Sequence, residues 1–386
     1  MRPRPRPELV ALPAAVHGGT HDARLLDFST GVSPLPPPAE IVAAVRDADL
    51  SRYPHPTALP VRQAIAGLHD LSPDRIVVGA GAVELIWALA RAFAGPDRRG
   101  LIVKPAFGEY EQALKASGAA VVSVEMREPQ FSFPVEEINA ALAASPITVA
   151  FVCRPSNPCL TAAPAESLTA IARRWPETLF VVDEAYLPMF EGVEGVPLEP
   201  NVVVLRSLTK IFALPGLRLG YLLAAPPVAA AVQATLPPWN VSSPAQAAGV
   251  VATSLLPSHV PSIRARITEL RLALAERLSG VVGPPQQSGG PFLLYLIEDA
   301  TTLVAALQAR GVLVRHAASF GLPEHIRFGV RSEPDQESLA RTWMPLGPSS
   351  HGRHRGLADQ PAHDRQRALD VPAHVDHRSK NLADDP

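Results

Sequence analysis

The segment from Ser207 to Gly220 carries a lysine just after the apolar run Val202–Leu205. Because burying an ammonium group is unfavourable, an apolar setting would lower the pKa of Lys210 and free its amine as a nucleophile, which suits Schiff-base chemistry. Ser207 and Arg218 flank it with a hydroxyl and a fixed cation, and both groups are good phosphate ligands. Taken alone, the pattern describes a surface lysine in a loop equally well.

A second apolar run, Leu179–Val182, leads into a carboxylate at Asp183, and Tyr186 follows three residues later. In open α/β sheets, ligands bind at the carboxyl ends of the strands. At that edge Asp183 could pair with a cationic ring nitrogen, and Tyr186 could donate a hydrogen bond from its phenol. The alternative is an N-cap aspartate that starts a helix.

Three further segments place ligand-binding groups after apolar runs. Asn157 lies in a proline-flanked loop that would aim its amide above the sheet. Gly81, Ala82 and Val83 form a glycine turn that opens a helix, where backbone N–H groups make an anion site. This turn lacks the spacing of a dinucleotide or nucleoside-triphosphate loop. Phe107 could stack on a planar cofactor. A plain turn and ordinary packing remain the alternatives for Asn157 and Phe107.

Together these segments supply a complementary set of groups in chain order. They are a phosphate site, an aromatic platform, an amide, a carboxylate, a phenol and a lysine, each placed after a strand. That combination fits pyridoxal phosphate, whose phosphate, ring, ring nitrogen, phenolic oxygen and aldehyde each need one such partner.

The elements that must position these groups can be read from the pattern of apolar residues. Seven short runs are typical of buried strands: Ile76–Ala80, Leu101–Val103, Val121–Val124, Thr148–Val152, Leu179–Val182, Val202–Leu205 and Tyr221–Ala224. Helical patterns lie between them at Val83–Ala94, Tyr110–Ser117, Val135–Ala144 and Pro164–Arg174. Such alternation predicts an α/β fold with a mostly parallel central sheet flanked by helices.

Proline content and changes of pattern predict four regions. Eleven prolines among the first sixty residues indicate an extended N-terminal arm without helix, residues 1–45. Residues 46–238 form the large domain that binds the cofactor. Residues 239–343 form a smaller C-terminal α/β domain with helices at Ala245–Leu256 and Pro261–Leu278. Residues 344–386 lack aromatic side chains and are expected to be a disordered tail, whose irregularly spaced histidines predict no metal site.

The overall composition excludes several classes of protein. The 386 residues are long enough for two domains, and a formal net charge of −2 argues against bulk binding to nucleic acid. The two cysteines, Cys153 and Cys159, are too few for a disulfide framework or a four-cysteine zinc site. With no apolar run of membrane-spanning length and no secretory signal, we expect a cytoplasmic protein without a membrane partner.

On these residues the sequence resembles the fold-type I, class I and II aminotransferases, which use pyridoxal phosphate. The block from Ser207 to Gly220 and the run Asp183-Glu184-Ala185-Tyr186 carry the resemblance, which covers residues 17–343. Within the family, the sequence is most similar to the branch that contains histidinol-phosphate aminotransferases and threonine-phosphate decarboxylases. The family's Asn-Pro-Thr-Gly reads Asn157-Pro158-Cys159-Leu160 here, so the asparagine is kept and the glycine is lost.

The resemblance implies a role for each residue near the cofactor ring. Lys210 would hold the cofactor through a Schiff base and, once released, act as the general base. Asp183 would keep the ring nitrogen protonated. Asn157 and Tyr186 would hydrogen-bond the phenolic oxygen, and Phe107 would stack on the ring. The catalytic set is therefore Lys210, Asp183 and Tyr186.

The resemblance also implies residues for the cofactor phosphate. Ser207, Arg218 and the amides of Gly81, Ala82 and Val83 would hold it. In this family, the tyrosine matched by Tyr53 reaches the phosphate of the neighbouring subunit. A homodimer with composite sites is therefore expected.

Two arginines are implied in substrate binding. Arg327 matches the residue that binds the substrate α-carboxylate, and a bidentate fork explains why arginine is needed there. Arg315 matches a residue that meets the distal phosphate of the substrate. Arginines on a surface strand are the alternative for both positions.

The expected function is that of a pyridoxal-phosphate-dependent aminotransferase acting on a small phosphorylated amino acid or amino alcohol. The direct rival is an L-threonine O-phosphate decarboxylase of cobalamin synthesis. His17-Gly18-Gly19, the segment Asp27–Gly31 and the Gly-Val-Arg ending at Arg331 resemble that branch. A catalytically silent cofactor-binding protein is a third alternative, against which the complete set of site residues argues.

Overall fold

A computed structural model of the chain describes residues 3–10 and 12–343. The predicted tail, residues 344–386, lies outside the described residues. Within the described ranges, none of the helices combines the length and apolar composition needed to cross a membrane.

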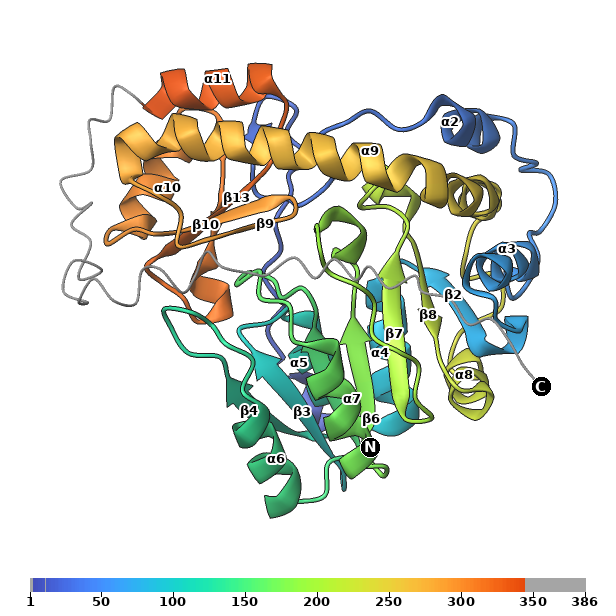
Figure 1. Ribbon diagram of the computed structural model, residues 1–386. Coiled ribbons are helices and arrows are strands. Elements are labelled where there is room, and N and C mark those ends of the chain that lie inside the picture. Colours follow the sequence, from blue (N-terminus) through green and yellow to red (C-terminus); the bar gives the residue numbers. More distant parts are fainter. Residues whose placement is uncertain (1–2, 11, 344–386) are drawn as a thin grey trace, which may run out of the picture.

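The larger part of the molecule is built around a seven-stranded sheet (Figure 1). Its strand order is β2-β8-β7-β6-β5-β3-β4. Its strands are β2 (Ile76–Ala80), β3 (Arg99–Lys104), β4 (Ala120–Glu125), β5 (Val149–Cys153), β6 (Leu179–Asp183), β7 (Val202–Ser207) and β8 (Leu219–Leu223). Each predicted run became a strand of this sheet. The alternation of short apolar runs with helices therefore located the sheet well, and the expected α/β fold is confirmed.

The direction of β8 departs from the prediction. β8 pairs antiparallel with both β2 and β7, whereas β3–β4, β3–β5, β5–β6 and β6–β7 are parallel pairs. A parallel connection needs a crossover of about a dozen residues or more, usually a helix. Between β7 and β8 the chain holds a single short 3-10 turn, η3 (Pro215–Leu217), so it simply reverses. The loop that carries Lys210 is that reversal.

Six helices cover the two faces of the sheet. One face packs against α3 (Leu59–His69), α6 (Val135–Ala144) and α7 (Ala165–Arg174). The other packs against α4 (Ala82–Phe93), α5 (Glu109–Ala116) and α8 (Pro226–Gln233). Neighbouring residues of one strand divide between these layers: Val204 belongs to the first core, and Val203 and Leu205 belong to the second.

The C-terminal part contains a second, antiparallel sheet in the order β12-β13-β10-β9. Its elements are α9 (Ser243–Val282), β9 (Gln287–Gly289), β10 (Phe292–Leu296), α10 (Ala300–Ala309), β11 (Val312–Leu313), β12 (Arg315–His316), η4 (Ala317–Phe320), β13 (His325–Gly329) and α11 (Glu333–Trp343). Its own apolar core lies between this sheet and the helices α9, α10 and α11.

The two helices predicted at Ala245–Leu256 and Pro261–Leu278 are one helix, α9, of 40 residues. The prediction was wrong because Pro257 and Pro261 normally end or kink a helix. Buried packing along both halves of α9 opposes that preference. Ala248 and Ala252 pack near one end, while Leu274 and Leu278 belong to the core of the second sheet. In Figure 1, α9 runs from the side of α3 to α10 and spans both parts of the molecule.

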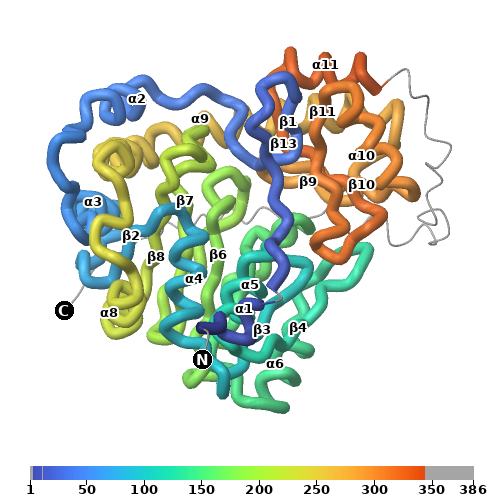
Figure 2. The backbone as a smooth tube through the Cα atoms, turned by 180° about the vertical axis from the view of Figure 1, so that it is seen from behind, coloured from blue at the N-terminus to red at the C-terminus, as the bar shows by residue number. Residues whose placement is uncertain are grey.

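The N-terminal arm runs across both parts of the molecule (Figure 2). It starts at α1 (Pro7–Val10) beside α5, and β1 (Leu26–Asp27) then pairs in parallel with β11. The expectation of an arm without helix was wrong at α1 and at α2 (Ala39–Arg46), which follows three consecutive prolines. Proline is tolerated just before a helix and in its first turn, so this run can lead into α2. The domain limits at residues 45, 238 and 343 stay predictions.

Candidate active site

A cavity of about 730 Å³ opens at the carboxyl ends of the parallel strands. All the predicted site residues except Tyr53 line it: Gly81, Ala82, Val83, Phe107, Asn157, Asp183, Tyr186, Ser207, Lys210, Arg218, Arg315 and Arg327. These residues come from segments more than 240 positions apart in the chain, and the sheet edge brings them to one place. The structure therefore assembles the set that the sequence singled out.

Asp183 ends β6 at the floor of this cavity and is buried. Its Oδ2 accepts a hydrogen bond of 2.7 Å from the Tyr110 hydroxyl, and its Oδ1 accepts one of 3.0 Å from the Ala185 amide. Burial raises the pKa of Asp183 above its ordinary value, although both hydrogen bonds act in the opposite direction. No helix starts at Asp183, so the N-cap alternative does not hold; the next element is the 3-10 turn η2 (Leu187–Met189).

Lys210 follows β7 by three residues and is half-buried. Its Nζ lies 5.5 Å from the centre of the Tyr186 ring, which is also half-buried in the cavity wall. Among the residues that the structure describes, no carboxylate forms an ion pair with Lys210. Its backbone is held in place, because its carbonyl accepts a hydrogen bond of 2.9 Å from the Ser33 amide. The amine thus faces the cavity without a partner that would occupy it.

The cavity also offers donors for an anion. Gly81 is the N-cap of α4, and among the described residues no side chain caps this helix. Its first amide N–H groups, which belong to residues that line the cavity, could therefore donate to an anion. The guanidinium of Arg218 lies beside Gly81. The hydroxyl of Ser207 is 3.1 Å from that of Thr209. The one acidic side chain of the first turn, Glu84, is turned away to the Ala80 amide, 2.6 Å from its Oε2.

Gly81 is needed at its position for two reasons. Its φ is +83° and its ψ is 162°, a region that is essentially restricted to glycine. A Cβ added there would lie 2.7 Å from Nη2 of Arg218, so the guanidinium would have to move. The cradle at the helix start is therefore shaped jointly by a glycine and an arginine.

We expect Gly81→Ala to weaken cofactor binding by about tenfold or more, because displacing Arg218 removes a charged hydrogen bond of roughly 1.5–3 kcal/mol. The dissociation constant of the cofactor, measured by titrating cofactor-free protein, tests this. Gly67→Ala is the matched control, because its Cβ would meet nothing within 4 Å. Equal dissociation constants for the two variants would contradict the role given to Gly81.

Arg327 lies buried in the cavity wall on β13. One Nη donates to Asn157 Oδ1, and the other donates to the Ser29 carbonyl at 2.6 Å. Nε has no hydrogen-bond partner among the residues that the structure describes. The guanidinium carbon lies 4.0 Å from the centre of the Phe292 ring. Burial lowers the pKa of Arg327 to about 10, which leaves the side chain charged at neutral pH.

Arg315 is a second buried cation in the same cavity. Its Nη2 donates to the Val16 carbonyl and to the Ser319 hydroxyl, each at 2.7 Å. In the part of the chain that the structure describes, neither Arg315 nor Arg327 forms an ion pair with a carboxylate. Neither arginine lies on an exposed strand surface, so that alternative is excluded for both.

Asn157 and Phe107 both line the cavity. Asn157 is buried, and because its carbonyl accepts from Arg327, its amide N–H groups remain to donate elsewhere. At the position of the lost glycine, Leu160 has a left-handed backbone with a φ of +63°. Phe107 packs edge-on against Tyr110, with ring centres 5.9 Å apart.

Tyr53 does not line the cavity. It is 82% exposed and lies against Trp239, with ring centres 4.9 Å apart. Trp239 is itself 46% exposed. Within one chain, Tyr53 therefore has no part in this site.

Several cavity residues were missed by the sequence reasoning. Tyr110 lies three residues after Phe107, and Thr209 lies directly before Lys210. Their hydroxyl groups were the available signal. The arm contributes a whole wall, made of residues 16–21, Asp27 and residues 29–32. His17 within this wall lies 2.9 Å from Glu109, whose other oxygen accepts from Trp87 Nε1 at 2.7 Å.

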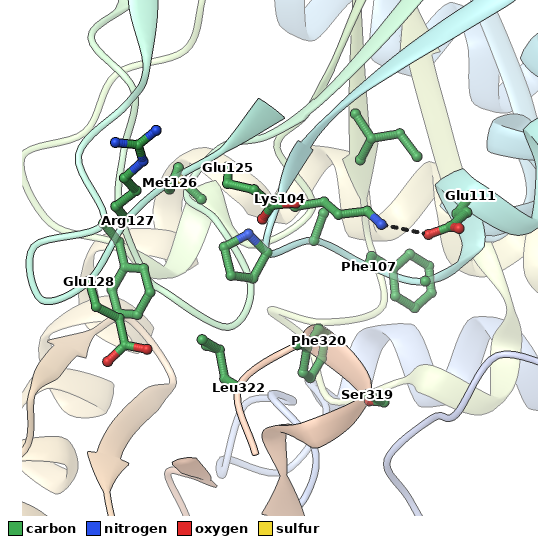
Figure 3. A pocket seen from close by; sticks show the side chains of 16 residues that line it. Lys104, Phe107, Glu111, Glu125, Met126, Arg127, Glu128, Ser319, Phe320 and Leu322 are labelled. Carbon is green, nitrogen blue, oxygen red and sulfur yellow. Dashed lines mark hydrogen bonds and ion pairs between the residues drawn. The ribbon is translucent and has the colours of Figure 1, made fainter. Parts of the chain in front are cut away.

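A second cavity, of about 510 Å³, shares Phe107 and Phe320 with the first (Figure 3). Its central charged group, Lys104, is already paired with Glu111 at 2.8 Å. Apart from Phe107, none of the predicted site residues lines it. The first cavity holds Lys210, Arg315 and Arg327, none of which pairs with a carboxylate among the described residues, and it is therefore the candidate active site.

The groups around the first cavity match those of pyridoxal phosphate. The helix amides and Arg218 could hold its phosphate, Asp183 its ring nitrogen, and Lys210 its aldehyde carbon. A bound phosphate would explain the glycine at position 81 beside Arg218. A bound aldehyde would explain the amine of Lys210, which forms no ion pair among the described residues.

Comparison with known proteins agrees with this chemistry. Over 82% of this chain and 88% of the relative, the sequence is 34% identical to the histidinol-phosphate aminotransferase of Symbiobacterium thermophilum. Histidinol-phosphate aminotransferase from Sinorhizobium meliloti in complex with pyridoxal-5′-phosphate has the same fold, with a TM-score of 0.75, 22% identity, and coverage of 83% and 90%. So does L-threonine-O-3-phosphate decarboxylase from Porphyromonas gingivalis, with a TM-score of 0.71, 23% identity, and coverage of 83% and 98%.

The family match spans most of the chain. Residues 23–342 match the model of the family "Aminotransferase class I and II". The chain therefore belongs to the class I and II aminotransferases, enzymes that use pyridoxal 5′-phosphate.

Proposed function

We propose that this enzyme transfers the amino group of a small phosphorylated amino acid or amino alcohol. The observation that carries the proposal is the pair of buried arginines, Arg315 and Arg327, in the cavity of Lys210. A buried cation without a carboxylate partner is unfavourable unless an anion fills its place. Two such cations suit a substrate with two anionic groups. The relative from Symbiobacterium thermophilum, named for a phosphorylated substrate, supports the same class.

The side chains around the cavity account for the steps of the reaction. When bound, pyridoxal phosphate supplies an electron sink that stabilises negative charge at the substrate Cα. The amine of Lys210 is the general base that removes the Cα proton and later returns it. Asp183, held by two hydrogen bonds, would keep a proton on the ring nitrogen. Asn157 and Tyr186 would donate to the phenolic oxygen, and Phe107 would support the ring face.

The arginines decide which bond of the substrate breaks. By binding the anionic groups of the substrate, Arg327 and Arg315 would set its pose in the cavity, and that pose would select between loss of the proton and loss of the carboxylate. Arg327 is itself fixed by Asn157 and Ser29, which gives the substrate carboxylate a rigid fork to bind.

Decarboxylation of L-threonine O-phosphate is the second candidate. The arm segments that resemble the decarboxylase branch, His17-Gly18-Gly19 and Asp27–Gly31, supply most of one cavity wall. Arg331, the third such feature, lies outside the cavity and pairs with Asp335. The arm therefore favours this candidate, and Arg331 does not bear on it.

The assembly state and the location of the enzyme also belong to the proposal. The exposed pair Tyr53 and Trp239 is the kind of aromatic surface that a second subunit would cover. A homodimer in which Tyr53 reaches the partner's cofactor phosphate would explain why it lies outside its own cavity. We place the dimer in the cytoplasm.

Product analysis by mass spectrometry tests the proposed reaction. The cofactor-loaded enzyme is incubated with histidinol phosphate plus 2-oxoglutarate, and separately with L-threonine O-phosphate. Glutamate and a keto product would support transamination, whereas aminopropanol phosphate and carbon dioxide would support the decarboxylase. No product from either mixture would overturn the proposed substrate class.

Arg327→Lys should raise KM for the substrate by roughly tenfold to a hundredfold, because lysine keeps the charge and loses the two-pronged fork, worth about 1.5–3 kcal/mol. Steady-state kinetics measures the change. Arg331→Lys, four residues further on and outside the cavity, is the control and should leave KM unchanged. An unchanged KM in Arg327→Lys would remove Arg327 from substrate binding.

A further inference from the structure

We infer that Tyr110 is a positioning residue that fixes the carboxylate of Asp183 against the cofactor ring. The inference rests on the proposed role of Asp183 as the partner of the ring nitrogen. Tyr110 belongs to the first turn of α5 and is fully buried. Its hydroxyl donates to Asp183 Oδ2 at 2.7 Å, across 73 positions of sequence.

The ring of Tyr110 is held rigidly on both sides. It stacks on Phe151 of β5, with ring centres 5.1 Å apart and planes 9° apart. Its other contact is the edge-on packing against Phe107, with ring centres 5.9 Å apart and planes 85° apart. One side chain therefore touches both the aromatic platform and the carboxylate, the two groups expected to meet the cofactor ring.

Two donors define the orientation of the Asp183 carboxylate. The Ala185 amide donates a hydrogen bond to Oδ1, and the Tyr110 hydroxyl donates one to Oδ2. Rotation of the carboxylate would therefore break one of these hydrogen bonds. A carboxylate oxygen accepts more than one hydrogen bond, so a direction remains open for the ring nitrogen. By fixing the carboxylate, Tyr110 sets the direction in which Asp183 can accept the hydrogen bond from the ring nitrogen.

The hydrogen bond also lowers the pKa of Asp183, which favours the charged carboxylate. Burial raises the pKa of Asp183, and the bond from Tyr110 is the largest effect that lowers it. The pKa of Tyr110 itself is raised well above its ordinary value by burial and by Asp183, so its hydroxyl stays protonated and remains the donor. The neighbouring thiol of Cys153 has a pKa raised to about 12 by burial and introduces no competing anion.

The substitution Tyr110→Phe removes this one hydroxyl and leaves the stacked ring. We expect the cofactor dissociation constant to rise about twofold to tenfold, the effect of losing one ordinary hydrogen bond. With 15N-labelled cofactor, we also expect the ring-nitrogen chemical shift to change. A purely structural residue would stabilise the protein equally with and without cofactor. For Tyr110→Phe we instead expect the urea midpoint of unfolding to fall more in the cofactor-loaded form than in the cofactor-free form.

Tyr295→Phe is the matched control. Tyr295 is also a buried tyrosine, but its hydroxyl has no hydrogen-bond partner among the described residues, and it lies in the core of the second sheet. Its removal should leave the dissociation constant and the ring-nitrogen shift at their wild-type values.

The outcomes separate this inference from the proposed function. If the wild-type chain binds cofactor and Tyr110→Phe keeps its dissociation constant and its ring-nitrogen shift, the inference is overturned and the proposed function stands. If the wild-type chain binds no cofactor, the proposed function falls and the inference falls with it. Weaker cofactor binding and a changed ring-nitrogen shift in Tyr110→Phe, with both quantities unchanged in Tyr295→Phe, would support the inference and the proposed function.

Discussion

The substitution Lys210→Ala is expected to lower turnover by at least roughly 10²–10⁴-fold, the usual contribution of a positioned general base. The loss should exceed this range if the amine also binds the cofactor covalently, because that route would disappear too. The fold should persist, since Lys210 is half-buried and forms no ion pair among the described residues. Single-turnover kinetics and circular dichroism of the loaded protein measure the two effects separately.

Lys115→Ala provides the control for Lys210→Ala. Lys115 lies on α5, pairs with Glu111 at 2.6 Å and has a side chain that is 49% exposed. Surface pairs of this kind contribute about 0–1 kcal/mol, so both activity and stability should stay near the wild-type values. Turnover in Lys210→Ala equal to that of Lys115→Ala would show that another group is the base.

The substitution Glu184→Gln is expected to destabilise the protein by about 3–5 kcal/mol. Glu184 is fully buried beside Asp183, and its carboxylate pairs with Arg154 at 3.1 Å and with Arg206 at 2.6 Å. It also accepts the Val196 amide at 2.9 Å. Glutamine keeps the size and removes the charge, which would leave two arginines facing each other. A loss of this size is a large part of the free energy of unfolding of a typical protein, which is roughly 5–15 kcal/mol.

A urea titration of the cofactor-free protein measures this loss. Glu199→Gln is the matched control, because Glu199 pairs at the surface with Arg173, whose side chain is 69% exposed. That change should cost less than about 1 kcal/mol. Similar midpoints for the two variants would mean that the Arg154–Glu184–Arg206 cluster does not hold the end of β6 in place.

The fold was predictable where local pattern decides the structure. Short apolar runs separated by helical patterns located the strands of the main sheet, and the structure extends most of them by a residue or two at their ends. The pattern did not show that β8 runs backwards, since a strand reads the same in both directions. It also divided α9 at Pro257, because the packing that stabilises the helix through its prolines involves residues distant in sequence.

The candidate site was predictable where a residue type is itself the signal. Lys210, Asp183 and Arg327 could be named because their chemistry is unusual at the end of an apolar strand. Tyr110 could not, because its role depends on a contact with Asp183 that only the folded sheet creates. The wall made by the arm was missed for the same reason, since proline-rich sequence does not indicate where a chain lies.

Reduction of the loaded enzyme with sodium borohydride is the most direct test that this cavity is the cofactor site. Hydride addition to a lysine–cofactor Schiff base makes a stable secondary amine, which peptide mass spectrometry locates. The chain offers four lysines, at positions 104, 115, 210 and 380. If Lys210 binds the cofactor, the label will be found on Lys210. A label on another lysine, or on none in a protein that binds the cofactor, would contradict it.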